Sequence, residues 1–200
     1  MKSKTHKEYL GDLIGGSLML KEAQAIAELL LNSPSAAEWN DAIINKNVLQ
    51  KRSEASAKRN AATLKKRLSG LSCEILEQIA FGGAELAAQL MFAATLINSP
   101  LLTDFMKHRV MDARRIYRES LDVSDWEGFW SDCCRLYPEF ESMSETSTYK
   151  ISQVAFKLLA DAGYLNSTKD KALQNVFILP ETRQLISAIN RDDVLSAMED

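Results

Sequence analysis

Residues that break helices are scarce in this sequence, which has eight glycines and four prolines in 200 residues. A protein built from many short strands needs more of these residues for its turns. Alanine, leucine, lysine and glutamate, which all have high helix propensity, are prominent throughout the chain. The composition therefore predicts a mainly α, compact multi-helix protein.

Cysteine is also rare, and the three cysteines form no disulfide framework. Cys133 and Cys134 are neighbours, which rarely bridge each other, and Cys73 lies far from them in the chain. A chain of 200 residues can bury a core large enough to fold without disulfides. Residues 1–9 include three lysines, but no apolar run follows them, so no secretory signal is expected. These features favour a cytoplasmic protein.

Long apolar runs are absent apart from residues 79–97, which have about the length of a membrane span. This stretch contains Glu85, two glycines and several alanines. A carboxylate near the centre of a span costs about 2.5–3.5 kcal/mol, and small residues contribute little apolar area to offset it. We therefore expect a buried helix and no contact with a membrane.

Catalytic motifs are absent as well. Gly15-Gly16 and Gly82-Gly83 lack the adjoining strand and lysine that a nucleotide site requires. His6 and His108 each stand alone, so the sequence offers neither a pair of metal ligands nor a base for a nucleophile. We expect no catalytic residue, no metal and no cofactor, and hence no enzyme. The carboxylates of residues 119–145 leave a metal-dependent nuclease open as an alternative.

Hydrophobic periodicity and capping residues predict a series of helices. Ser35 is expected to cap one of them and Thr148 another. Residues 138–147 are acidic and polar, as is typical of a linker. We therefore predict a helical domain at residues 1–145 and a subdomain at residues 146–200. The predicted helices cover residues 18–31, 36–44, 52–68, 72–78, 79–97, 101–120, 124–137 and 149–162.

Strand-like sequence occurs near the end of the chain. Residues 164–165 and 176–179 are apolar and lie on either side of a polar loop at residues 166–170. A helix followed by a two-stranded hairpin is the layout of a winged helix-turn-helix. Residues 146–200 are therefore predicted to be winged-helix-like. The alternative is that the same residues cover the end of the core.

Charge is segregated along the chain, although the formal net charge is only −3. Residues 46–67 hold eight basic side chains against Glu54, a balance of +7. Residues 119–145 hold eight acidic side chains against Arg135, a balance of −7. Such blocks are typical of surfaces that meet charged partners. The acidic block could either repel nucleic acid or dock a basic partner.

The basic block falls mostly on the helix predicted at residues 52–68. At about 100° per residue, basic and hydroxyl side chains line one face of this helix, and Ala57, Ala61 and Leu64 line the opposite one. Such side chains are typical of a helix that contacts DNA phosphates, and two short helices precede it, as in a three-helix DNA-binding unit. The alternative is a solvated, lysine-rich surface. The DNA-binding candidates are Arg52, Ser56, Lys58, Arg59, Thr63, Lys66 and Arg67.

Two further clusters are weaker candidates for contacts with DNA. In one of them, Asp112 and Glu119 offset part of the positive charge. The other is the polar face of the helix predicted at residues 149–162, whose opposite face is apolar. These secondary candidates are Arg114, Arg115, Arg118, Lys150, Gln153 and Lys157.

Three segments carry a resemblance to a known family. They are YLGDLIGGSLMLKEAQAIAELLL at residues 9–31, NVLQKRSEASAKRNAATLKKRL at residues 47–68 and YKISQVAFKLLADAGYL at residues 149–165. They resemble the BrxA family, a small component of bacteriophage-exclusion (BREX) defence loci, and the resemblance runs over nearly the whole chain. It implies a helical fold similar to that of the antitermination protein NusB, and the ability to bind DNA. It also implies that the protein acts beside a methyltransferase, a large ATPase and other phage-defence proteins.

Two functions are consistent with these features. The first is a non-enzymatic DNA-binding component of a BREX-type phage-defence system, which contacts duplex DNA mainly through its phosphates with the basic helix. The second is an adaptor, in which the basic and acidic blocks dock other defence proteins and DNA is not touched.

Overall fold

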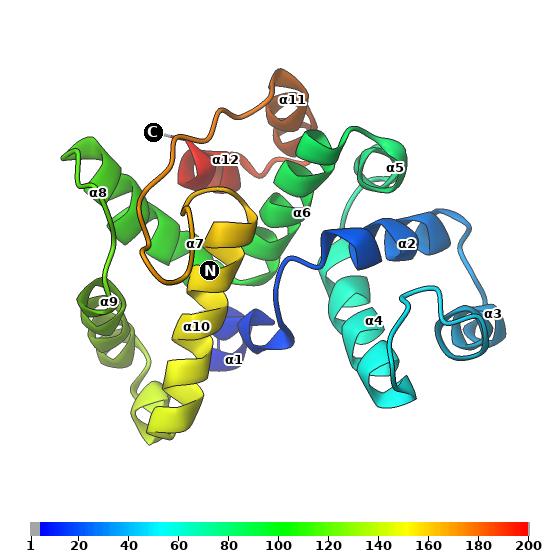
Figure 1. Cartoon of the computed structure of the whole chain (residues 1–200), viewed down its shortest axis with the longest axis horizontal. Coiled ribbons are helices and arrows are strands. Elements are labelled where there is room, and N and C mark those ends of the chain that lie inside the picture. The colour runs from blue at the N-terminus through cyan, green and yellow to red at the C-terminus, as the bar shows by residue number, and fades with distance from the viewer. Residues whose placement is uncertain (1–4, 200) are drawn as a thin grey trace.

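The computed structural model describes residues 5–199, which form a mainly helical protein without strands (Figure 1). Two 3₁₀ turns, Leu13–Gly15 and Pro138–Ser142, and two π-helical segments, Asp41–Asn45 and Met106–Met111, accompany the α-helices. The α-helices are α1 (His6–Leu10), α2 (Leu20–Leu31), α3 (Ala36–Asn40), α4 (Glu54–Leu68), α5 (Cys73–Phe81), α6 (Ala84–Asn98), α7 (Pro100–Phe105), α8 (Asp112–Arg115), α9 (Val123–Leu136), α10 (Glu145–Asp161), α11 (Pro180–Ala188) and α12 (Asp192–Met198).

The central helix of the fold is α6. Figure 1 shows α2 to α5 on one side of α6, and α7 to α10 on the other. The helix packs against α2, α4 and α5, and also against α7, α11 and α12. All residues from Leu90 to Leu96 are buried, as expected for a helix that is apolar on all sides. The prediction of a buried helix is confirmed for this part of the sequence.

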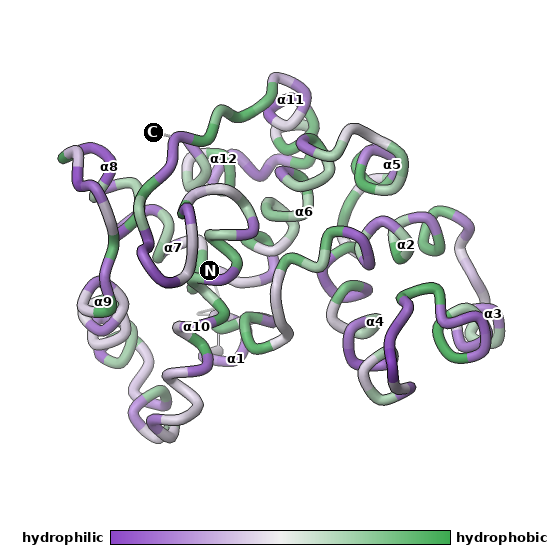
Figure 2. The backbone as a smooth tube through the Cα atoms, viewed as in Figure 1, coloured by the Kyte–Doolittle hydropathy of each residue, from purple (hydrophilic) through white to green (hydrophobic). Residues whose placement is uncertain are grey.

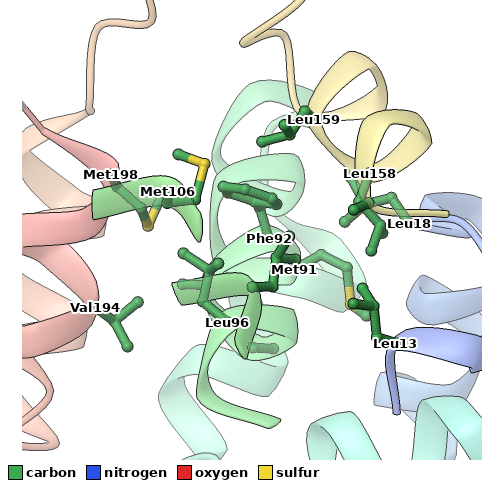
Figure 3. Close-up of a cluster of buried hydrophobic side chains, with 14 of the residues drawn as sticks. Leu13, Leu18, Met91, Phe92, Leu96, Met106, Leu158, Leu159, Val194 and Met198 are labelled. Carbon is green, nitrogen blue, oxygen red and sulfur yellow. The ribbon is translucent and has the colours of Figure 1, made fainter. Parts of the chain in front are cut away.

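The core joins described residues from near both ends of the chain. Figure 3 shows Met91, Phe92 and Leu96 of α6 at its centre. Around them lie side chains from the 3₁₀ turn after α1, from the segment before α2, and from α10 and α12. These side chains are Leu13, Leu18, Leu158, Leu159, Val194 and Met198. The division into residues 1–145 and 146–200 stays a prediction, and the described residues of both parts contribute to one core.

The helix predicted at residues 79–97 is in fact two helices, because the chain bends at Gly82 and Gly83. α5 ends at Phe81, and α6 begins at Ala84. The backbone of Gly82 lies so near α5 that a Cβ atom on it would be 2.4 Å from the Gln78 carbonyl oxygen. A glycine is therefore required at this bend.

Among residues 5–199, no single helix is long and apolar enough to cross a membrane. Figure 2 colours α6 mainly white and green, as expected for an apolar helix. By length and composition α6 passes as a membrane span only together with Pro100–Arg115, and the two parts are bent by 109° relative to each other.

The segment predicted as a linker packs against the core. Pro138–Ser142 form a 3₁₀ turn, and Phe140 at the middle of this turn is buried. Its ring lies 5.0 Å from that of Trp130 and 5.8 Å from that of Tyr137, measured between centroids. The linker prediction is wrong for this turn, because a single aromatic side chain in a polar segment is enough to anchor it.

The two predicted helix caps have different outcomes. Ser35 caps α3 as predicted, and Glu38 completes a capping box by accepting a hydrogen bond from the Ser35 N–H. Thr148 is not a cap, because α10 begins one turn earlier. The N-terminal cap of α10 is Ser144, whose Oγ accepts a hydrogen bond from the Ser147 N–H at 3.3 Å.

The predicted C-terminal hairpin is absent from the described residues. Leu165 forms an isolated antiparallel bridge with Leu173, and residues 176–179 belong to no strand. Gln89 of α6 holds this extended segment instead: its amide donates to the Phe177 carbonyl at 2.9 Å and accepts from the Leu179 N–H at 3.0 Å. The strand prediction is wrong, and the segment covers the end of the core, as the alternative interpretation proposed.

Candidate nucleic-acid interface

The basic helix predicted from the sequence is α4, and its start differs by two residues. Ser53 caps it, because the Ser53 Oγ accepts a hydrogen bond from the Ser56 N–H. Arg52 therefore precedes the helix, although its side chain is exposed. The positive side chains of the interface thus begin in the loop that leads into α4.

The two faces of α4 are arranged as the helical pattern predicts. Ala57, Ala61, Leu64 and Leu68 are buried. On the other face Lys58, Arg59 and Lys66 are exposed, while Ser56 and Thr63 are half-buried. The free cationic groups are Arg52, Arg59 and Lys66, since none of the three has a hydrogen bond or ion pair with residues 5–199.

Three other DNA-binding candidates on α4 make contacts within the protein. Ser56 Oγ accepts a hydrogen bond from the Ser53 hydroxyl at 3.1 Å. Lys58 pairs with Glu54 at 3.5 Å in an exposed contact, which is weak enough to be exchanged for a phosphate. Thr63 packs against Gly15, where a Cβ atom would lie 2.6 Å from the Thr63 methyl group.

Arg67 does not belong to the exposed face. Its side chain is completely buried, and its Nε donates a hydrogen bond to Asp12 Oδ2 at 2.5 Å. The guanidinium also donates to the carbonyl oxygens of Ser17 at 2.9 Å and of Gly16 at 3.2 Å. In this arrangement it cannot reach DNA, so Arg67 leaves the candidate set. Its position three residues after the buried Leu64 places it at the border of the apolar face, which is a signal visible in the sequence.

The loop at residues 12–18, which joins α1 to α2 along the chain, contacts both α4 and α10 in space. Its first residue, Asp12, is bound by Arg67 of α4, and the Leu18 N–H donates to Asp161 of α10 at 3.3 Å. The 3₁₀ turn Leu13–Gly15 within the loop packs against both helices. Figure 1 shows this loop running between α10 and α4.

Ile14, at the tip of this loop, is 57% exposed and lines two neighbouring cavities. One cavity also contains Arg59 of α4. The other contains Lys150, Gln153 and Lys157 of α10. The primary candidates on α4 and the secondary candidates on α10 therefore lie on either side of one loop. Helical phase could not have found this relation, because it depends on a loop that is distant in sequence.

The α10 candidates differ in whether they form hydrogen bonds or ion pairs within the protein. Lys150 and Gln153 are exposed and have no hydrogen bond or ion pair with residues 5–199. Lys157 pairs with Asp161, one turn further along the helix, at 2.6 Å. Phosphate contacts from α10 would therefore come mainly from its first half.

The three arginines of the remaining cluster are engaged within the protein. Arg114 donates to the Gln174 carbonyl at 3.3 Å, and Arg115 pairs with Asp112 at 3.0 Å. Arg118 binds both carboxylate oxygens of Asp125, at 2.6 and 2.8 Å. In Figure 1 the end of α8, where this cluster lies, is on the side of the molecule away from α4. The structure thus places this cluster away from α4.

Two residues near α4 were missed as site candidates from sequence. Lys51 forms an ion pair with Glu22 of α2, and Asn60 lines the same cavity as Arg59. Burial, the largest single effect, raises the pKa of Glu22, but the hydrogen bond with Lys51, a backbone hydrogen bond and the charges of Lys51 and Lys21 together lower it further, so the pKa lies below its usual value. Glu22 is therefore ionised and paired at neutral pH. Lys51 is recognisable as basic in the sequence, but its partner is known only from the fold.

Comparison with known proteins identifies the family of this chain. The family model described as BrxA matches residues 7–190. The chain belongs to the BrxA family. It is 38% identical, over 98% of its length and 92% of the relative's, to a protein of Escherichia coli O9:H4 (strain HS) named "BREX protein BrxA".

A second curated relative and a solved structure are also similar to this chain. A protein of the same name from Paramagnetospirillum magneticum (strain ATCC 700264 / AMB-1) is 30% identical, and the match covers 96% of each chain. The crystal structure of an uncharacterized protein from Magnetospirillum magneticum superposes with a TM-score of 0.87 at 29% identity, covering 96% of this chain and 98% of that one. The sequence matches therefore show the family, and the solved structure shows that the fold is shared.

The acidic block of this BrxA-family chain is partly neutralised by its own arginines. Asp132 accepts hydrogen bonds from Arg109 and from Arg135, and the hydrogen bond from Arg135 contributes most to lowering its pKa. Asp125 is bound by Arg118. Within residues 5–199, no group of three or more His, Cys, Asp or Glu side chains is arranged to hold a metal ion.

Proposed function

We propose that this protein is a DNA-binding component of a BREX phage-defence system and that it contacts the phosphates of duplex DNA through α4 and α10. Family membership supports the defence role. The observation that supports DNA binding is the set of unpaired cations, Arg52, Arg59 and Lys66, beside the α10 surface across the 12–18 loop. Arginine and lysine on one surface bind the DNA backbone largely independently of base sequence.

The proposed role needs no catalysis, and we propose that the protein is not an enzyme. Its partners would be duplex DNA and other proteins of the defence system, and no membrane is required. The basic surface would hold the DNA while other components perform the chemistry.

Salt-dependent binding to a short DNA duplex tests this proposal. Each phosphate neutralised by the protein contributes roughly 0.9 to the slope of log K against log salt. Replacing Arg52, Arg59 and Lys66 together with alanine should therefore lower the slope by about 3. Stability should change little, because these are exposed positions and alanine is a good helix former.

A matched control removes three other exposed cations. Arg115, Arg135 and Arg183 have exposed side chains on other helices, and replacing them with alanine changes the net charge equally. This variant should keep the salt slope of the unmodified protein. If the α4 variant folds normally and keeps that slope as well, α4 is not part of a DNA interface.

A second candidate function, a protein adaptor, is favoured by a different cavity. Between α2 and α5, Phe81 is 68% exposed and lines a cavity with Leu31 and two glutamates, Glu28 and Glu77. An apolar floor with acidic neighbours is suited to a basic segment of another protein. If duplex DNA does not bind, or binds equally well to the α4 variant, this adaptor role becomes the leading proposal.

A further inference from the structure

The cavity beside Arg59 collects hydrogen-bond donors that the protein itself does not use. It has a volume of about 550 Å³ and opens between the 12–18 loop, the start of α2 and the exposed face of α4. Its lining residues are Ile14, Gly15, Gly16, Ser17, Met19, Glu22, Lys51, Arg59 and Asn60.

Two side chains of α4 provide donors in this cavity. Arg59 carries a guanidinium and Asn60 a carboxamide, and neither has a hydrogen bond with residues 5–199. The hydroxyl of Ser17 is also without a partner among these residues. Donors left unused at a cavity are available to a ligand that accepts hydrogen bonds.

The backbone of the loop provides another donor, and the buried Arg67 determines its direction. Arg67 binds the Gly16 carbonyl oxygen from the protein interior at 3.2 Å. Every peptide bond in residues 5–199 is trans, so the Ser17 N–H points in the direction opposite to this carbonyl. It therefore points away from Arg67, and it forms no hydrogen bond with residues 5–199. Gly16, with a φ of 118°, allows the turn that a larger residue would strain.

The charges in the cavity favour an anion. Glu22 is the carboxylate among the lining residues, and its partner Lys51 neutralises it. The side chains of this pair are only 22% and 23% exposed, so the pair forms part of the wall. Arg59 adds a positive charge that nothing in residues 5–199 compensates.

We propose that this cavity is an oxyanion site that binds a tetrahedral phosphate group through Arg59, Asn60 and the backbone N–H of Ser17. The phosphate belongs either to the backbone of bound DNA, in which case the inference rests on the proposed function and deepens it, or to a free phosphate ion. Both present the same oxygen acceptors to the same donors.

The test follows backbone amide signals by ¹⁵N NMR while the full-length protein is titrated with inorganic phosphate and, separately, with a short DNA duplex. Phosphate is expected to shift the backbone amide signal of Ser17. Sodium sulfate and sodium chloride are titrated separately in the same way. Asn60→Asp should weaken phosphate binding by about tenfold, because it replaces a donor with a negative charge. Ala62→Asp makes the same charge change at an exposed position on α4 outside the cavity, and it should have a much smaller effect.

A second pair of variants keeps the test valid if Asn60→Asp unfolds. Arg59→Gln removes the charged donor from the cavity, and Lys66→Gln removes an exposed charge two turns further along the same helix. Arg59→Gln should weaken phosphate binding and Lys66→Gln should not. The proposal would be overturned if Asn60→Asp and Ala62→Asp weakened phosphate binding equally and Arg59→Gln and Lys66→Gln did so too. Such a result would show only general attraction of phosphate to a basic surface.

The two titrants distinguish the source of the phosphate. If the duplex also shifts Ser17 and displaces inorganic phosphate, the site binds the DNA backbone. If phosphate shifts Ser17 but the duplex neither shifts it nor competes, the site is for a free phosphate ion. If neither titrant shifts Ser17, there is no oxyanion site, while duplex binding that depends on Arg52 and Lys66 would leave the proposed function intact.

Discussion

Arg67 and Asp12 form an ion pair that is almost completely removed from water, with side chains 0% and 7% exposed. The guanidinium also donates to the carbonyls of Gly16 and Ser17. The Oδ1 atom of Asp12 is buried and has no hydrogen-bond partner among the described residues. Asp12 therefore depends on one cation for its stabilisation, and the same cation fixes the 12–18 loop.

Replacing Arg67 should be strongly destabilising. We expect Arg67→Met to lower the free energy of unfolding by about 3–5 kcal/mol, because it leaves a buried carboxylate without its cation. Urea denaturation measures this loss. The exposed neighbour Lys66 provides the control, and Lys66→Met should stay within about 0.5 kcal/mol of the unmodified protein. Adding Asp12→Asn to Arg67→Met should restore part of the lost stability. Equal stability of Arg67→Met and Lys66→Met would contradict the ion-pair argument.

The cysteines should differ in reactivity because their surroundings differ. Cys133 is buried, and this burial raises the pKa of its thiol to about 12, whereas Cys73 is exposed. Only the thiolate reacts with alkylating reagents. At about pH 8, iodoacetamide should therefore modify Cys73 in the folded protein and leave Cys133 unmodified until urea is added. Mass spectrometry of tryptic peptides reports both sites, and early modification of Cys133 would show that this part of the core is open.

At the scale of elements, one polar side chain of α6 bonds to the segment that leads into α11. Gln89 is nearly buried in an otherwise apolar stretch, and it binds the Phe177 carbonyl, the Leu179 N–H and the Thr182 hydroxyl. This one carboxamide attaches the extended segment before α11 to the centre of the fold. It replaces the strand pairing that the apolar sequence at residues 176–179 suggested.

Removing the carboxamide should release that segment. We expect Gln89→Met to reduce the free energy of unfolding by about 2–3 kcal/mol, since buried partners lose their hydrogen bonds. Hydrogen–deuterium exchange should become faster at Leu179 and in the first turn of α11, with little change in α4. Gln153→Met is the control, because Gln153 is exposed and unbonded to residues 5–199. Unchanged exchange at Leu179 would mean that packing of Ile178 alone holds the segment.

At the scale of the whole molecule, the two predicted parts should depend on each other for folding. Phe92 of α6 packs against Tyr164, whose ring centroid lies 5.2 Å away, and the Tyr164 hydroxyl donates to the Met198 carbonyl at 2.8 Å. A fragment of residues 1–145 would expose these surfaces of α6. We expect it to lack a cooperative thermal transition, whereas the full chain unfolds in one step. Circular dichroism and calorimetry check this, and a cooperative transition in the fragment would support the predicted division at residue 145.

Composition and periodicity were sufficient to predict the helical class, the buried stretch of α6 and the apolar and exposed faces of α4. These are local properties, because a helix places residues three and four apart on the same face wherever it occurs. The family could also be read from sequence, since the resemblance of three segments agrees with the match over residues 7–190. Each of these conclusions depends on residues close together in the chain or on the sequence as a whole.

Only the tertiary structure decided which charged groups are free. Arg67 and Arg59 are both basic residues of α4. Arg67 is buried and paired with Asp12 from a loop that is distant in sequence, whereas Arg59 stays unpaired with residues 5–199. The same holds for residues 176–179, where Gln89 of α6 replaces a partner strand. Ion pairs and hydrogen bonds between distant segments depend on where the chain brings their partners, and desolvation then determines whether a charge is structural or available to a ligand. That dependence is why the sequence could predict a basic helix, whereas the fold alone determined which of its cations are available.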